Sequence, residues 1–139
     1  MFKVLLDTNQ LVSSLLTIHG VQGQIIDEWR RRAFLLFLAP GQIEEVAAVL
    51  RRPKIARKYS IGSADQQGFI ALLRADAMVL PEANRPGVCR DPDDDFLLGC
   101  AVAGGVEYLV TGDADLLTLR EHRGVTILDG RHFLSILTR

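Results

Sequence analysis

The chain opens with the stretch FKVLLDTNQL, residues 2–11, in which an almost wholly apolar run, Phe2 to Leu6, is followed directly by an acid, Asp7. A similar order recurs in EYLVTGDADLL, residues 107–117, where a second apolar run leads to Asp113. Short apolar runs bounded by polar residues are typical of buried strands. The sequence therefore predicts two buried strands that each end close to a carboxylate.

Strand and helix patterns alternate along the rest of the chain. The expected strands are 2–6, 34–38, 78–80, 108–111 and 125–128, and the expected helices are 10–17, 22–32, 41–52, 54–59, 64–77, 93–103, 114–119 and 130–137. Thr8 or Asn9, Ser63 and Asp93 are the expected N-caps of the first, fifth and sixth helices. Because the strands are apolar on both faces, we expect a parallel sheet covered by helices on both sides. The predicted fold class is α/β, a three-layer α/β/α sandwich formed by one domain, residues 1–139.

Composition indicates an ordinary globular protein. Hydrophobic residues make up 48% of the 139 residues and charged residues 24%, which argues against disorder. The longest apolar stretches, such as 34–40, are far shorter than the roughly 20 residues that a membrane helix needs, and no signal peptide is visible. The two cysteines cannot form a disulfide framework or a zinc site, and Cys100 falls in an apolar helical run. We therefore expect a cytoplasmic protein without a membrane segment.

The charges are unevenly distributed although the net charge is only −1. Basic residues gather at 30–32 and again at 51–58, while four acids fall within residues 91–95. Basic clusters of this kind are commonly solvated helix ends, since cations are favoured at helix C-termini. The alternative interpretation is a footprint for a phosphate backbone beside an acidic centre.

The acids are predicted to converge at one edge of the sheet. Parallel strands end on the same edge, where ligands bind in open α/β sheets, so Asp7 and Asp113 meet there if their strands are neighbours. Asp94 or Asp95, at the start of the sixth helix, and Glu45, at the start of the third, begin at this edge too. Each acid could instead cap its own helix or, in the case of Glu45, lie in solvent. Two strands that end on acids favour a site over capping alone.

Such a site would suit a divalent cation. Clustered carboxylates repel one another until a proton or a cation neutralises them, and oxygen ligands without histidine or cysteine suit Mg²⁺ or Mn²⁺. The three histidines lie near none of the acidic motifs. The chemistry expected of this arrangement is metal-assisted phosphodiester hydrolysis.

Several motifs of the chain resemble those of a known family. The segments DTN, IEEVAAVLRRPK and RDPDDDFLLGCAVAGGVEYLVTGDADLL, together with the closing strand and helix, resemble a PIN domain over essentially the whole chain. The nearest group is the VapC-like toxins of type II toxin–antitoxin systems. The resemblance implies a Mg²⁺-dependent endoribonuclease, with Mn²⁺ as an alternative metal, that acts on RNA, is held inactive by a cognate antitoxin and forms a homodimer.

The resemblance also implies roles for particular residues, carried over motif by motif. It assigns catalysis to Asp7, Glu45, Asp94 and Asp113, metal binding to Asp7, Asp94, Asp113 and Asp115, and the steadying of these acids to Asn9 and Thr111. Glu45 would orient or deprotonate the attacking water. The chain departs from the family pattern at Ala39-Pro40, where members often carry Ser-Pro, which removes a hydroxyl group but no acid.

Two other enzyme and signalling functions fit the sequence less well than a nuclease. A signalling receiver needs two adjacent acids after the first strand and a lysine after the last, whereas this chain has Asp7-Thr8-Asn9 and Leu128-Asp129-Gly130. A phosphatase of the DxDxT type fails similarly, because Asn9 stands at its second acid. The stronger alternative is a non-catalytic PIN-like domain that binds RNA or a protein without cutting it.

Overall fold

Six strands form one sheet in the order β3-β2-β1-β4-β6-β5 in the computed structural model, which describes residues 1–139. Their bounds are β1 (Phe2–Leu6), β2 (Phe34–Leu38), β3 (Met78–Val79), β4 (Tyr108–Val110), β5 (Glu121–His122) and β6 (Val125–Leu128). Five strands are parallel, as predicted, and β5 pairs antiparallel with β6 at the edge. The central parallel sheet is therefore confirmed, and β5 is an additional edge strand that the sequence pattern does not predict. This strand is short and polar, and it forms through a tight turn at Arg123 and Gly124, both with positive φ.

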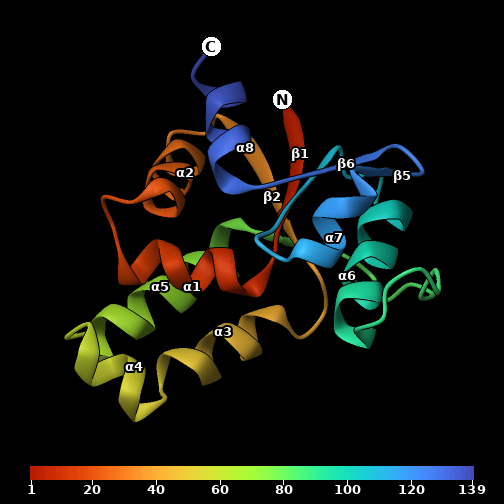
Figure 1. Ribbon diagram of the computed structural model, residues 1–139. Coiled ribbons are helices and arrows are strands. Elements are labelled where there is room, and N and C mark those ends of the chain that lie inside the picture. Colours follow the sequence, from red (N-terminus) through yellow and green to blue (C-terminus); the bar gives the residue numbers. More distant parts are fainter.

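Eight helices occur in the predicted order (Figure 1). They are α1 (Thr8–Leu16), α2 (Val21–Arg30), α3 (Gln42–Leu50), α4 (Pro53–Lys58), α5 (Ser63–Asp76), α6 (Pro92–Ala103), α7 (Ala114–Leu119) and α8 (Gly130–Leu137). None of them has both the length and the apolar character needed to cross a membrane.

Three predicted helix caps are wrong, and in each case the helix begins earlier in the chain than expected. Asp7, not Thr8 or Asn9, caps α1 by accepting the Gln10 N–H. Asp91, not Asp93, caps α6, and Gly62, not Ser63, holds the N-cap position of α5. In α1 and α6 the cap is the residue whose side-chain oxygen reaches the free N–H groups of the first turn, whereas Gly62 has no side chain that could do so.

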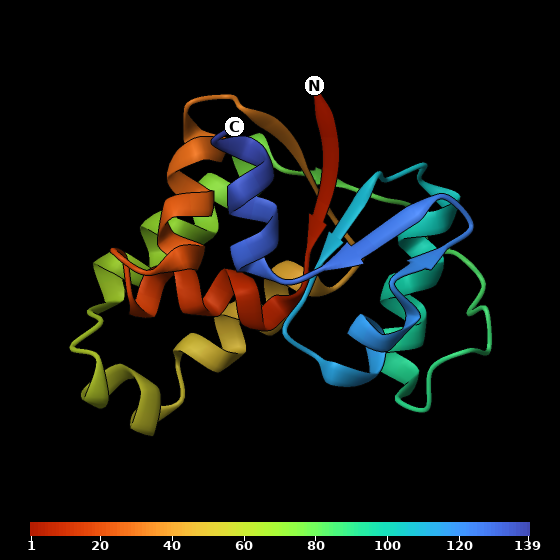
Figure 2. The same ribbon diagram turned by 45° about the horizontal axis from the view of Figure 1, so that its top comes forward.

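Helices cover both faces of the sheet, which confirms the three-layer α/β/α sandwich. Side chains alternate along β1, so that Val4 and Leu6 pack with α1, α2, α3, α5 and α8, while Leu5 packs with α6 and α7. Figure 2 shows α1, α2 and α8 on one side of the strands and α6 and α7 on the other. Burying a Leu or Val side chain contributes about 1.5–3 kcal/mol. This two-sided burial fixes β1, and with it the residue that follows, Asp7.

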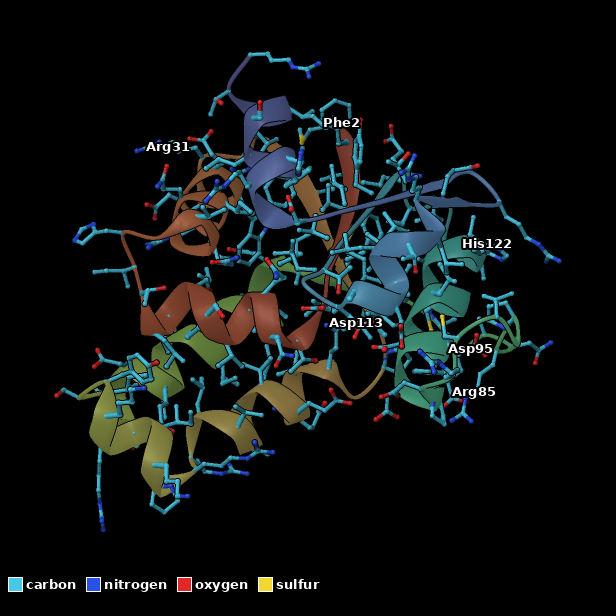
Figure 3. The ribbon with its side chains drawn as sticks, viewed as in Figure 1. Phe2, Arg31, Arg85, Asp95, Asp113 and His122 are labelled. Carbon is cyan, nitrogen blue, oxygen red and sulfur yellow. The ribbon has the colours of Figure 1, made fainter.

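The parallel strands all run toward the same edge of the sheet. Leu6 at the end of β1 pairs with Val110 at the end of β4, and Val110 pairs with Leu128 at the end of β6. Figure 3 shows Phe2 and Arg31 near the top of the molecule and Asp113 near its middle. The helices that follow these strands, α1, α7 and α8, begin at the carboxyl edge, as does α3 after β2.

Candidate active site

A cleft of about 540 Å³ opens at the carboxyl edge of the sheet, with α3 and α6 contributing its walls. Three of the four predicted catalytic acids line it: Asp7 after β1, Glu45 on α3 and Asp94 on α6. Asp113 does not line the cleft, but it lies close enough for its charge to raise the pKa of both Asp7 and Asp94. The structure therefore brings acids from four distant parts of the chain to one place.

Asp7 serves both as a helix cap and as an acid of the cleft. Its Oδ1 accepts the Gln10 N–H at 2.9 Å, and its Oδ2 accepts the Thr111 hydroxyl at 2.5 Å. Burial raises the pKa of Asp7 and the nearby charge of Asp113 adds to this, while the hydrogen bonds from Thr111 and from the Gln10 and Gly112 N–H groups oppose it. On balance the pKa of Asp7 is raised although the residue caps α1. Capping therefore does not prevent Asp7 from having a functional role.

Thr111 connects the two strand ends. Its side chain is fully buried, and its hydroxyl donates to Asp7 while accepting the Asp113 N–H at 3.0 Å. Asp113 in turn caps α7, with Oδ2 accepting the Leu116 N–H at 2.9 Å. This arrangement follows from the pairing of β1 with β4, which sets Asp7 beside the end of β4.

The acids at the start of α6 have three different roles. Asp91 caps the helix by accepting the N–H groups of Asp93 and Asp94. Asp95 is buried, and it accepts N–H groups from Gly87, Val88 and Cys89, which ties the loop before α6 to the helix. Burial alone would raise the pKa of Asp95, but these hydrogen bonds outweigh it and hold the pKa below the ordinary value. Of the two acids considered for the cleft, Asp94 lines it and Asp95 does not.

Asp94 carries the clearest sign of crowded negative charge. Burial is the largest cause of its raised pKa, and repulsion from Asp113, Asp91, Asp7 and Asp93 adds to it, bringing the pKa to about 6. A carboxyl group with a pKa near the working pH, in a cleft with other acids, is a recognised indicator of a functional site.

Glu45 is held at the cleft by one side-chain hydrogen bond, and the start of its helix is anchored by a residue that the sequence pattern does not single out. Its Oε2 accepts the Thr8 hydroxyl at 2.9 Å. The start of α3 is itself fixed by Gln42, a buried residue that donates to the Leu6 carbonyl at 2.7 Å and accepts the Ala39 N–H at 2.8 Å. Gln42 thus joins the ends of β1 and β2 beneath the cleft. In the sequence it is only one more polar residue in the first turn of a helix.

Two predicted site residues lack the contacts expected of them. The Asp115 carboxylate is exposed and pairs with Arg90, with Nη2 to Oδ1 at 3.2 Å, and it does not line the cleft. Asn9 lines the cleft but makes no side-chain hydrogen bond to any acid. The assigned roles of both residues stay predictions.

The donor set fits a hydrated hard cation. All nearby charged ligands are carboxylates, and their mutual repulsion is relieved when a divalent ion is present. No three acidic, histidine or cysteine side chains are placed to hold one ion directly. Mg²⁺ is usually bound through only one or two carboxylates and keeps several waters. Asp7 and Asp94 could therefore hold it, with other acids acting through water.

The fold and the acid-lined cleft define an α/β/α protein with a candidate cation site at the carboxyl edge of its sheet. The sequence model of the PIN domain family matches residues 3–115, and the chain belongs to this family. The match includes all five predicted acids. PIN domains are generally nucleases, so nuclease activity is the first activity to consider.

Two further proteins are similar over most of the chain. An uncharacterized protein of Methanocaldococcus jannaschii, MJ1680, is 28% identical over 132 residues, which cover 94% of this chain and 83% of the relative. The crystal structure of PAE2754 from Pyrobaculum aerophilum superposes with a TM-score of 0.63 at 18% identity, covering 99% of this chain and 96% of the other. At that identity the superposition supports the fold alone.

Proposed function

We propose that residues 1–139 act as a Mg²⁺-dependent endoribonuclease that hydrolyses RNA phosphodiester bonds. The observation that carries this proposal is the electrostatic crowding of Asp94 by Asp7 and Asp113 in a cleft whose other wall presents Glu45. Such a cleft repels a polyanion until a cation binds, and membership of the PIN domain family favours a nuclease.

In this proposal some acids of the cleft would hold the cation, and another would accept a proton. Asp7 and Asp94 would hold Mg²⁺ or Mn²⁺, and Asp113 would act directly or through water. The bound cation supplies Lewis-acid polarisation of a phosphate oxygen. Glu45, oriented by the Thr8 hydroxyl, would accept the proton of the attacking water. Asp115 would take part only after leaving Arg90.

The proposal extends to biological context. The resemblance of the chain to VapC-like toxins supports a role as the toxin of a type II toxin–antitoxin pair. In that role a cognate antitoxin would block the cleft, and the toxin itself would be a homodimer. We expect the protein to co-purify with the product of a small neighbouring gene. The complex should lack ribonuclease activity.

A second candidate function is a non-catalytic domain that binds RNA or a protein. The observation in its favour is that no three side chains are arranged to grip one ion directly. This alternative predicts RNA binding without cleavage in the presence of Mg²⁺ or Mn²⁺.

The decisive experiment measures cleavage of defined RNAs with Mg²⁺ and with a chelator. Asp7→Asn and Asp94→Asn should each lower the rate by at least about 100-fold, the scale of losses at metal-site and acid–base groups. The matched control is Asp27→Asn, the same substitution at an exposed position on α2 outside the cleft. Cleavage that survives chelation or either cleft substitution contradicts the assigned roles, and intact RNA throughout favours the binding domain.

A further inference from the structure

Four exposed cations follow one another from the cleft along α4. Arg52 lines the cleft and precedes α4, and Lys54, Arg57 and Lys58 lie on the helix itself. None of the four forms an ion pair with an acid of the protein. We call these four residues the basic track.

Folding explains only part of the basic track, since Lys58 alone has an intramolecular partner, the ring of Tyr59, with Nζ 5.4 Å from the ring centroid. No residue of α4 is buried, and the helix lies at the end of the molecule away from both termini (Figure 1). Lys54 shares one helical face with Arg57 and Lys58, three and four positions later, where like charges repel. The helix dipole favours Arg57 and Lys58 in the last turn but disfavours Arg52 and Lys54 at the N-terminus. An external anion would relieve both conflicts.

Arg52 connects the track to the acids. It is the only basic residue among those that line the cleft, where it stands with Asp7, Glu45 and Asp94. The neighbouring Arg51 instead borders a separate groove between α3 and α5, so the track leaves the cleft along α4 and not along α5. A phosphate chain that enters the acidic cleft would therefore meet cations on this side.

The second basic cluster, Arg30 to Arg32, is differently placed. Arg30 and Arg32 border a pocket with Met1 and Phe34, at the amino edge of the sheet, and Arg31 pairs with Glu28 at 3.0 Å. Figure 3 shows Arg31 and Phe2 toward one end of the molecule and Asp113 well removed from them. Five-residue strands such as β1 and β2 separate the two edges by roughly 17 Å. This cluster therefore provides a matched control.

We propose that the basic track binds the phosphates of the RNA nucleotides that flank the one in the cleft. That the bound strand is RNA rests on the proposed function. Arg52 contacts the phosphate at the cleft, and Lys54, Arg57 and Lys58 contact those that follow. The six residues of α4 span about 9 Å. A stacked strand rises about 3.4 Å per nucleotide along its axis, so the helix spans two or three nucleotide steps.

The test compares two triple variants with the same loss of three positive charges. Lys54→Gln/Arg57→Gln/Lys58→Gln removes the helical part of the track, and Arg30→Gln/Arg31→Gln/Arg32→Gln removes the other cluster. Binding of a fluorescein-labelled single-stranded oligouridine is followed by anisotropy over a salt series at constant Mg²⁺, with Glu45→Gln in the wild type and in every variant so that the cleft can hold its cation and the RNA stays intact. All six residues are exposed, and thermal melts verify that both variants fold.

The track variant should lower the slope of log affinity against log salt by about 2, because each single-strand phosphate contact contributes about 0.7. Between about 50 and about 200 mM salt, the wild type should then lose roughly 20-fold more affinity than the track variant. The control variant should keep the wild-type slope. Equal effects of both triples, or no effect of the track variant, would overturn the proposal. If the track variant does not fold, Lys54→Gln alone should lower the slope by about 0.7, and no change would again overturn it.

Cleavage assays with Mg²⁺ separate this result from the fate of the proposed function. Track-dependent binding without any cleavage means that the nuclease proposal fails and the track stands. If the wild type cleaves RNA and the track variant keeps the wild-type KM and salt slope, the nuclease proposal stands and the track proposal fails.

Discussion

At the scale of single residues, Thr111 links the two strand ends through its hydroxyl group. Thr111→Val keeps the shape of the side chain but removes the hydroxyl shared by Asp7 and Asp113. Loss of a buried hydrogen bond to a charged group should cost about 2 kcal/mol of unfolding free energy, measurable by urea denaturation. Because this bond lowers the pKa of Asp7, its loss should raise that pKa further. Ribonuclease activity should then require a higher pH.

Thr111→Ser is the control for this effect, since serine keeps the hydroxyl and loses only a methyl group. It should retain most of the activity and the wild-type pH profile. If serine shifts the profile as far as valine does, packing of the methyl group and not the hydrogen bond positions Asp7.

At the scale of elements, the start of α6 depends on Asp95. Asp95→Asn replaces one acceptor oxygen by a donor that faces the N–H groups of Gly87, Val88 and Cys89. The thermal midpoint should fall by about 5–10 °C at neutral pH. Because the folded-state pKa of Asp95 is lowered, its stabilising effect is present above the ordinary value of 3.8 and is lost as the pH falls through the folded value. The deficit of the variant should therefore shrink in strong acid.

Asp93→Asn is the matched control, because Asp93 lies in the same first turn but is exposed and accepts no hydrogen bond. It should change the midpoint by much less than Asp95→Asn. Equal losses in the two variants would show that the helix dipole, and not the tied loop, stabilises this end of α6.

The same helix shows what the sequence can and cannot predict. Parallel strands end at one edge, so the sequence predicted that Asp7 and Asp113 meet an acid from the start of α6, on condition that β1 and β4 are neighbours. The residue pattern alone left Asp94 and Asp95 open, because both are first-turn acids and only the preceding loop distinguishes them, and the resemblance to the PIN family selected Asp94. Gln42 bonds to the Leu6 carbonyl 36 positions away, and Arg90 pairs with Asp115 at a separation of 25. Periodicity carries no information about such long-range polar contacts.

At the scale of the whole molecule, charge is segregated although the net charge is only −1. Acids gather at the cleft, and the basic track leads away from it along α4. The crowded acids oppose folding when they are ionised, because repulsion and burial raise the pKa of Asp94 to about 6 and also raise that of Asp7. Folding without metal is thus weakened by the same charges that would attract a cation.

The stability of the metal-free protein should therefore fall as the pH rises from about 5 to about 7.5. In this range the folded protein binds more protons than the unfolded chain, because the pKa of Asp94 rises from 3.8 to about 6 on folding. Mg²⁺ should raise the thermal midpoint at about pH 7.5 and much less at about pH 5, where protons already neutralise the acids. Asp94→Asn should reduce both the pH dependence and the Mg²⁺ effect. A Mg²⁺ shift of the same size at both pH values, or one unaltered by Asp94→Asn, would mean that the cation binds elsewhere on the protein.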